Sequence, residues 1–184
     1  MKTIDIPAPK FSRFLFSDKR MAWFWLLVRL YVGWTWLSAG WGKLHKSTWV
    51  GSQAGTAIKG FFMGVLEKSS GLHPIVSNWY AWFIQHVALP HTVLFSYLIT
   101  FGEFLVGIGL ILGIFTGVAA LFGGFMNMNF ILAGAISINP TLLFLEFLLL
   151  LAWRIAGYFG LDRYIFLHIF LPVSKYEQPG APKS

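Results

Sequence analysis

Ionisable side chains occur inside the long apolar runs of this sequence, where a charge is costly, and they are the first candidates for chemistry. They are Arg29, Glu103, Glu146 and Arg154, whose formal charges cancel. Charged residues at membrane depth usually mark a path for a substrate, an ion or a proton. A carboxylate beside an arginine and an amide can bind an anion, orient a quinone head group or relay protons. The structural alternative is an ion pair between Arg29 and Glu103 that fixes the register of two helices.

Two amides, Asn127 and Asn129, interrupt the apolar stretch FMNMNFILAGAISINP at residues 125–140. A polar group buried without a partner costs on the order of 1 to 3 kcal/mol, so both amides need partners. At about 100° per residue the two side chains are about 200° apart on a helix, so they cannot address one partner. We expect one to meet the charged layer and the other to bridge to a neighbouring helix.

Helical depth and phase group the polar residues further. A rise of about 1.5 Å per residue predicts that Arg29, Glu103 and Asn127 share one layer, with Glu146 nearer the outer side. Glu103 and Gly107 form a pair one turn apart, which is expected to leave room beside the carboxylate. One stripe of the first helix, which we expect to face protein, follows steps of four and three residues: Arg29, Gly33, Trp36, Gly40 and Lys43.

The elements that must position these residues are predicted to be membrane-spanning helices. The chain has 184 residues, of which 57% are hydrophobic and 11% are charged. Several apolar runs approach the roughly 20 residues needed to cross about 30 Å of hydrocarbon. They lack the alternation of barrel strands, so we predict an all-α integral membrane protein, a single domain over residues 1–184. Its transmembrane helices form a four-helix bundle, with spans at 21–39, 92–112, 117–137 and 142–159.

Basic residues indicate the topology. The arm 1–20 contains five of the 14 lysines and arginines and precedes an apolar run without a clear cleavage site, which predicts an uncleaved signal anchor. Basic residues also flank the last span and the short tail 172–184, so both termini are predicted to be cytoplasmic in a multi-pass protein of the cell membrane. The net charge of +7 then reflects topology and anionic lipid head groups rather than nucleic acid.

A segment of about fifty residues, 40–91, separates the first two spans. Its part NWYAWFIQHVAL, residues 78–89, is aromatic-rich and poor in charge, which favours the interface between membrane and water. We interpret it as an interfacial belt or cap, with a lid over an outward-facing site as the alternative. The short connections 113–116 and 138–141 predict antiparallel hairpins between the later spans.

Residue types restrict the redox groups that the chain itself can hold. Cysteine is absent, which excludes thiolate nucleophiles, disulfides and cysteine-ligated iron–sulfur clusters from this chain. The histidines lie in loops or at span ends, so no intramembrane bis-histidine haem is expected, and a metal site at His86 and His91 is the less favoured reading. Any electron carrier must therefore be a bound small molecule or a partner protein.

Four stretches together carry a resemblance to a known family. They are LLVRLYVGWTWLSAGWGKL at 26–44, FGEFLVGIGLILGIFTGVAAL at 101–121, NMNFILAGAISINP at 127–140 and GYFGLDRY at 157–164. With these the sequence resembles the DoxX/DoxD family of small four-helix membrane proteins. The asparagine-rich third span and the Ser-x-Asn-Pro turn are closest to the DoxD branch.

The DoxD resemblance implies the membrane subunit of thiosulfate:quinone oxidoreductase. That enzyme joins two thiosulfates into tetrathionate and passes two electrons to quinone, with a second small subunit, DoxA. Related members are components of oxidoreductase complexes with sulfurtransferases or superoxide dismutase. Quinone would thus be the electron acceptor, and a DoxA-like or other redox subunit the partner. The resemblance does not assign individual roles to the positions that match polar motif residues: Arg29, Lys43, Glu103, Asn127, Asn129, Asn139 and Asp162.

Chemistry and resemblance together yield a set of candidate site residues. The candidate catalytic residues are Glu103 and Arg29. Quinone needs a proton route, for which Glu103 is the candidate. Thiosulfate is a dianion and needs cations, which Arg29 or the outward-facing Lys43, His45 and Lys46 can supply. Candidate substrate-binding residues are Lys43, Asn127, Asn129, Asn139, Arg154 and Glu146.

Three functions stay open at the level of sequence. The first is a quinone-linked oxidoreductase subunit of the thiosulfate type. The second is a non-catalytic anchor that recruits soluble redox enzymes, and the third is a small transporter or channel for an anion or protons. Whether the chain is catalytic alone, and whether it forms a homo-oligomer, are not fixed by the residues.

Overall fold

A computed structural model describes residues 9–165, and every regular element in that range is helical. The predicted all-α class is confirmed for the described residues, among which no strand occurs. The first eight residues of the basic arm and the predicted tail 172–184 lie outside the described residues. The elements follow in the order α1 (Lys10–Ser17), η1 (Lys19–Met21), α2 (Ala22–Leu44), α3 (Thr56–Lys68), α4 (Asn78–Phe83), η2 (Ile84–Ala88), η3 (Leu89–His91), α5 (Thr92–Leu112), α6 (Thr116–Leu132), α7 (Asn139–Leu151) and α8 (Trp153–Ala156).

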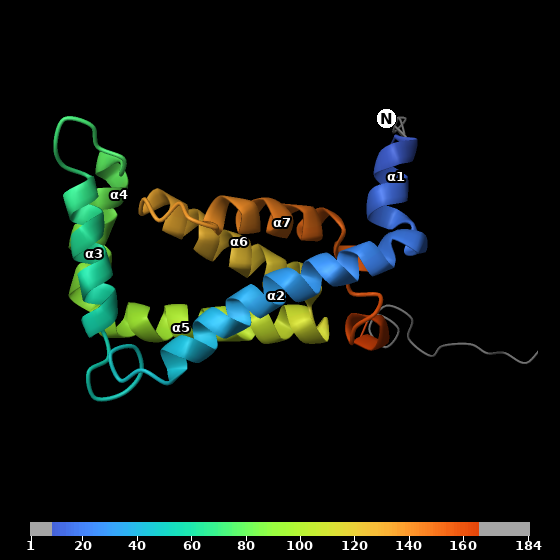
Figure 1. The fold of residues 1–184 in the computed structure, drawn as a ribbon, viewed down its shortest axis with the longest axis horizontal. Coiled ribbons are helices and arrows are strands. Elements are labelled where there is room, and N and C mark those ends of the chain that lie inside the picture. Colours follow the sequence, from blue (N-terminus) through green and yellow to red (C-terminus); the bar gives the residue numbers. More distant parts are fainter. Residues whose placement is uncertain (1–8, 166–184) are drawn as a thin grey trace, which may run out of the picture.

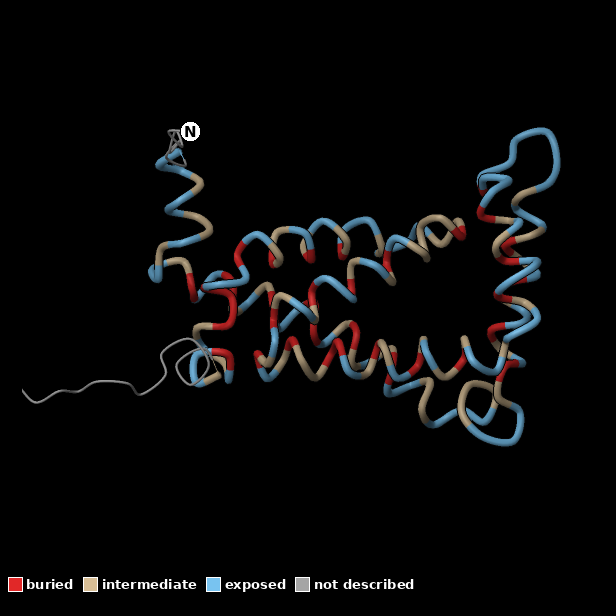
Figure 2. The backbone as a smooth tube through the Cα atoms, turned by 180° about the vertical axis from the view of Figure 1, so that it is seen from behind, coloured by how far each residue is buried: buried red, intermediate tan, exposed pale blue. Residues whose placement is uncertain are grey.

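The four longest apolar elements, α2, α5, α6 and α7, run broadly along the long axis of the molecule (Figure 1). α2 crosses α5. α6 and α7 form an antiparallel pair, and α6 also packs against α5. Buried residues recur along the facing sides of these helices (red in Figure 2). The core cluster that they form includes Trp25, Trp36, Leu110 and Leu149. One core therefore joins all four helices.

α3 and α4 stand across this axis at one end of the molecule (Figure 1). Together with η2 they form a second core, which includes Ile58, Phe62, Tyr80 and Ile84 and also takes in Ala133 at the end of α6. Pro90 lies in the 3-10 turn between the π-helical turn η2 and α5, where the chain changes direction. The residues between α2 and α5 therefore form a folded helical unit rather than a simple loop.

α1 and the short turn η1 lie at the opposite end, also away from the long axis (Figure 1). Asp18 caps η1, because its carboxylate accepts a hydrogen bond from the Arg20 backbone nitrogen at 2.9 Å. The side-chain hydrogen bond from Arg20 holds the pKa of Asp18 below its usual value. The half-buried Phe16 stacks on Trp25 of α2, so this end of the chain is fixed to the helix core.

Length and hydropathy distinguish the helices. Among the described residues one helical segment, Asn78–Leu112 with 35 residues, is long and apolar enough to cross a membrane, and Thr116–Leu132 and Asn139–Leu151 are apolar but shorter. α2 has 23 residues, but Arg29 and several tryptophans lower its hydropathy. The apolar run 142–159 is not one continuous helix, because α7 ends at Leu151 and only the short α8 follows.

The crossing of α2 and α5 depends on glycines. A Cβ added at Gly40 would lie 2.5 Å from the Phe104 nitrogen, and one at Gly33 would lie 3.0 Å from the Leu110 Cβ. Gly107 of α5 is pressed against the Leu37 backbone in the same way. The space expected at Gly107 beside Glu103 is therefore filled by α2. The predicted stripe is confirmed in its first four members, which are buried: Arg29, Gly33, Trp36 and Gly40.

Candidate functional site

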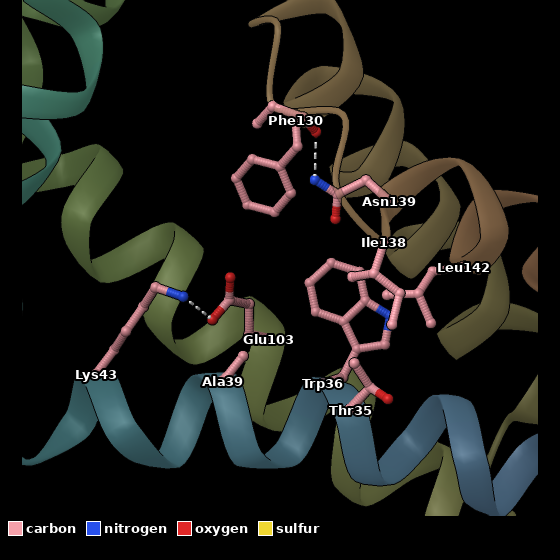
Figure 3. Close-up of a pocket in the computed structure, with 10 residues that line it drawn as sticks. Thr35, Trp36, Ala39, Lys43, Glu103, Phe130, Ile138, Asn139 and Leu142 are labelled. Carbon is pink, nitrogen blue, oxygen red and sulfur yellow. Dashed lines mark hydrogen bonds and ion pairs between the residues drawn. The ribbon is translucent and has the colours of Figure 1, made fainter. Parts of the chain in front are cut away.

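A pocket of about 270 Å³ opens where α2 and α5 meet the turn between α6 and α7. Lys43 and Glu103 lie on one side of it and Trp36, Leu142 and Asn139 on the other (Figure 3). Most of the remaining wall is apolar, including Ala39, Ile138 and Phe130. An apolar cavity with a few convergent polar groups is the usual form of a small-molecule site.

The polar side of the pocket is an ion pair. Lys43 Nζ lies 2.5 Å from Glu103 Oε2, and the Glu103 side chain is 2% exposed against 21% for Lys43. The ammonium also lies over the Trp49 ring, 5.1 Å from its centroid. Gly40, one turn before Lys43, lets the α5 backbone approach closely enough for the two charges to meet. The pair presents one donor and one acceptor to the pocket with no net charge.

Arg29 does not take part in this pair. Gly40 contacts the Glu103 backbone and is eleven residues from Arg29, so the arginine lies roughly 16 Å further along α2 at about 1.5 Å per residue. Arg29 is buried and donates from Nη2 to the Phe159 carbonyl at 3.2 Å, while Nε and Nη1 have no hydrogen-bond partner among the described residues. The expectation that Arg29, Glu103 and Asn127 share one layer is therefore wrong, as is the Arg29–Glu103 pair.

The end of the molecule where Arg29 lies is held together by Asp162. Its carboxylate accepts hydrogen bonds from the backbone nitrogens of Phe115 at 2.6 Å and Thr116 at 2.9 Å, which caps the N-terminus of α6. Its own nitrogen donates to the Gly113 carbonyl at 2.7 Å. The Asp162 carboxylate also acts on the buried Arg29 through its charge. This motif position therefore closes the fold rather than lining the pocket.

Replacing Asp162 by alanine is expected to reduce the free energy of unfolding by about 1 to 3 kcal/mol, since two buried N–H groups lose their acceptor. Asparagine at this position should restore part of the loss, because its side-chain oxygen can still accept one bond. Chemical denaturation in detergent micelles measures both. Equal stability of the alanine variant and the wild type would contradict the capping role.

A second buried polar cluster lies behind Trp36. Its indole Nε1 donates to Glu146 Oε1 at 2.5 Å, and Asn127 Nδ2 donates to Glu146 Oε2 at 2.6 Å. Glu146 is 1% exposed and Asn127 fully buried. Gly123 makes room for the carboxylate, because a Cβ there would lie 2.7 Å from Glu146 Oε1. Since the Trp36 ring also lines the pocket, this cluster is in direct contact with the pocket wall.

The two asparagines of α6 have different partners, as their helical phase predicts. Asn127 meets the carboxylate of Glu146. Asn129 donates to the Phe125 carbonyl of its own helix at 2.8 Å and accepts a hydrogen bond from the Tyr80 hydroxyl at 3.3 Å. Tyr80 also donates to the Asn129 carbonyl at 3.0 Å, so Asn129 joins α6 to α4. The expectation of different partners is confirmed, but Asn127 meets Glu146 and not the expected layer of Arg29 and Glu103.

The remaining candidates are distributed unevenly. Asn139 lines the pocket and donates to the Ala135 carbonyl at 2.7 Å, which shapes the turn before α7. Arg154 is exposed on α8, with its guanidinium 5.4 Å from the Trp153 ring centroid, and it does not line the pocket. Arg154 therefore does not join the other candidate residues at the pocket. Trp36 and Phe130, which the sequence analysis did not assign to the site, form much of the wall.

A larger apolar groove of about 900 Å³ lies on the other side of Phe130. Its lining residues come mainly from α5 and α6 and reach α3 and α4. Phe130 borders both the groove and the polar pocket, and its ring stacks on Trp36 at 6.3 Å. Exposed apolar side chains such as Leu98, Leu105 and Phe122 line it. Phe130 is thus shared by the linings of the apolar groove and of the pocket that contains the Lys43–Glu103 ion pair.

No group of three or more histidine, aspartate or glutamate side chains converges as a metal site within the described part of the chain. His86 and His91 each bond to a carbonyl one turn earlier in the chain, at 3.0 and 2.9 Å. The pocket contains one carboxylate and no imidazole. The donor set there suits an organic ligand better than a metal ion.

Comparison with known proteins assigns the chain to a family. No curated protein and no solved structure matches it significantly. The model of the DoxD family, described as the TQO small subunit DoxD, matches residues 24–166, where TQO stands for thiosulfate:quinone oxidoreductase. The match contains the ion pair, the Glu146 cluster and the Asp162 cap. The chain therefore belongs to the DoxD family of membrane proteins.

Proposed function

We propose that this chain is the membrane subunit of a quinone-linked oxidoreductase of the thiosulfate:quinone type, and that its polar pocket binds the quinone head group. In the overall reaction two thiosulfates and one quinone take up two protons and yield tetrathionate and quinol. A sulfur–sulfur bond forms as the two thiosulfates together lose two electrons, and these two electrons reduce the quinone. The observation that carries the proposal is the Lys43–Glu103 pair, with its buried carboxylate, in a pocket that shares the Phe130 ring with an apolar groove.

The charge balance of the pocket supports a neutral ligand. Lys43 and Glu103 neutralise each other, so a quinone ring, which is polar but uncharged, adds no net charge to a buried site. A dianion such as thiosulfate would place two further negative charges beside the Glu103 carboxylate, at a high desolvation cost. Lys43 donates a hydrogen bond to one quinone oxygen in this proposal, and Glu103 takes up a proton during the reduction and passes it to the reduced oxygen.

The groove supplies what an isoprenoid quinone needs besides its head group. Its lining is almost wholly apolar, and it meets the pocket at Phe130. A tail in the groove and a ring in the pocket would bury apolar and polar parts of one molecule in matching surroundings. Phe130 then acts as the gate between them.

Thiosulfate is proposed to react at the surface rather than in the pocket. His45 and Lys46 are exposed just beyond the end of α2, two and three residues after Lys43 of the pocket lining. Exposed cations at this position can hold a dianion against a partner subunit by charge-assisted hydrogen bonds. This assigns the sulfur chemistry to a complex with a DoxA-like or other redox subunit.

The membrane arrangement proposed here takes α2, α5, α6 and α7 as a four-helix transmembrane bundle with both termini cytoplasmic. α3 and α4 lie across the axis of these helices, and α4 exposes Trp79 and Trp82, by 62% and 60%. Tryptophans favour the head-group level, which supports an interfacial position at the outer side. The pocket then lies near the outer membrane surface, close to the exposed cations.

Photolabelling of the full chain in lipid nanodiscs tests the quinone site. One probe is a long-chain ubiquinone with an azide on its ring, the other carries the azide at the end of the tail. We expect the ring probe to label the segments of Trp36 and Asn139, and the tail probe to label the groove. Excess unlabelled long-chain ubiquinone should compete, whereas excess phospholipid should not.

Two phenylalanines give a matched pair for the groove. Phe122 lines the groove and is 58% exposed, while Phe147 of α7 is 56% exposed and lies outside it. Phe122→Ala should weaken tail labelling roughly fivefold, because losing part of an apolar contact costs about 1 kcal/mol. Phe147→Ala should leave it unchanged. Equal effects would show that the tail probe only samples the lipid-facing surface.

Activity provides the second arm. Thiosulfate-dependent quinone reduction is measured with candidate partner subunits added, and Glu103→Gln should abolish it without preventing assembly of the complex. If no combination reduces quinone and the ring probe labels wild type and Glu103→Gln alike, the quinone proposal fails. The remaining readings are then an anchor for soluble redox enzymes or a small transporter.

A further inference from the structure

Glu146 lies in the interior with two N–H donors and no cation. Trp36 Nε1 and Asn127 Nδ2 each donate to one oxygen of its carboxylate, at 2.5 and 2.6 Å. The ion pairs found among the described residues do not include it. We propose that Glu146 is a proton-binding site of this protein and that the Asn127 amide turns over to hold it in both protonation states.

The observed contacts fit the ionised form. Each carboxylate oxygen accepts one hydrogen bond, and bonds to a charged acceptor are about twice as strong as neutral ones. Two such bonds offset part of the several kcal/mol that burying an unpaired charge costs. The contacts do not fit the neutral acid, whose O–H group must donate while the indole N–H cannot accept.

The acceptor that the neutral acid requires is already present on Asn127. Its Oδ1 is buried and has no hydrogen-bond partner among the described residues. Turning the amide by about 180° about its last torsion, which is broad and roughly two-fold, brings Oδ1 to Glu146 Oε2. The nitrogen and oxygen of the amide are similar in size, so packing is unchanged. A leucine side chain at position 127 could hydrogen-bond to Glu146 in neither of its protonation states.

No neighbouring charge in the described structure fixes Glu146 in one state. α2, α6 and α8 pack against α7, and Val106 of α5 borders the same space at Gly123. α6 has no charged side chain, and Arg154 of α8 is exposed. The charged groups of α2 and α5 are engaged elsewhere: Lys43 pairs with Glu103 and Arg29 bonds to Phe159.

The proton on Glu146 acts on the pocket through Trp36. The indole N–H is bonded to the carboxyl group, and the ring of the same residue lines the pocket. A change of charge on Glu146 changes the strength of that bond and hence how firmly the pocket wall is held. Glu146 is thus a positioning residue. The proton site itself does not depend on the proposed function. Its use as a source of one of the two protons that quinone reduction consumes does rest on that function.

Infrared difference spectroscopy of the full chain in lipid, without quinone, tests the site directly. We expect a carbonyl band of a protonated carboxylic acid that titrates with pH in wild type and is lost in Glu146→Gln. With ¹³C-labelled asparagine, the same titration should shift an amide carbonyl band. Asn127→Leu should abolish that shift and the titration, and the matched change Asn129→Leu on the same helix should preserve both.

Three results overturn the inference. The first is the absence of a Glu146-sensitive band at every pH, and the second is a band that never titrates in wild type. The third is a titration without any asparagine shift, which removes the amide reversal. If Asn127→Leu does not fold, Asn127→Asp is used in its place. The new carboxyl group and Glu146 should then share one proton over the whole pH range of the titration. If the quinone probes do not label the wild-type protein while Glu146 still titrates, the proposed function is refuted and the inference about Glu146 stands.

Discussion

Lys43→Met is expected to lower the free energy of unfolding by about 3 to 5 kcal/mol, because it leaves the Glu103 carboxylate buried without its partner. Glu103 is only 2% exposed, so it cannot turn to water when the ammonium is lost. Denaturant unfolding in mixed micelles at neutral and at acid pH measures the effect. The loss should be smaller at acid pH, where the orphaned carboxyl group takes up a proton.

The two halves of this pair should respond unequally. Lys43 is 21% exposed and has a flexible stem, so in Glu103→Gln the ammonium can move toward solvent and the loss is smaller. The double variant Lys43→Met with Glu103→Leu removes both charges and should recover most of the stability. Lys59→Met, at an exposed position of α3, is the control and should stay within about 0.5 kcal/mol of wild type. A double variant no more stable than Lys43→Met would contradict the argument.

Gly40→Ala is expected to destabilise the protein by about 2 to 3 kcal/mol, since the added carbon overpacks the α2–α5 crossing. It would lie 2.5 Å from the Phe104 nitrogen and 2.8 Å from its Cα, and a helix backbone cannot move without separating the two helices. Because Glu103 precedes Phe104, the same change should also displace the ion pair. Thermal unfolding followed by circular dichroism reports the stability change.

Gly42 provides the control on the same helix. A Cβ there meets nothing within 4 Å, so Gly42→Ala removes only the conformational freedom of glycine and should stabilise α2 by about 0.5 to 1 kcal/mol. The two substitutions are chemically identical and two residues apart, so opposite signs isolate the effect of the crossing. The same sign for both would show that helix propensity, not packing, governs this region.

The helices themselves were largely predictable from the apolar runs. α5 covers the same residues as the run 92–112, and α2 begins one residue after the expected start. The α6–α7 connection differs, because Gly134 adopts a φ of 71° and ends the helical path before the apolar run is complete. α7 also ends before its apolar run is complete, because the hydropathy of a run does not show where a turn made of apolar residues interrupts it.

The partners within the site were harder to predict. Depth along each helix was estimated as if the helices were parallel and began at one level, whereas α2 crosses α5 and brings its last turn, not its middle, to Glu103. The crossing point depends on glycines that are spread over two helices. Trp36 lay on the predicted stripe, but the partner of an indole N–H is not encoded in local spacing. Only the phase argument for Asn127 and Asn129 was independent of helix crossing.

The cap on α6 also has a consequence for the order of biosynthesis. The N–H groups of Phe115 and Thr116 find their acceptor only in Asp162, which leaves the ribosome after α6, α7 and α8 have been made. Until Asp162 has been synthesised, the N-terminal N–H groups of α6 in a nascent α5–α6 hairpin therefore lack this acceptor. We therefore expect chains released before residue 162 to be recognised by quality control, even though the long helices of the described range 9–165 are all present.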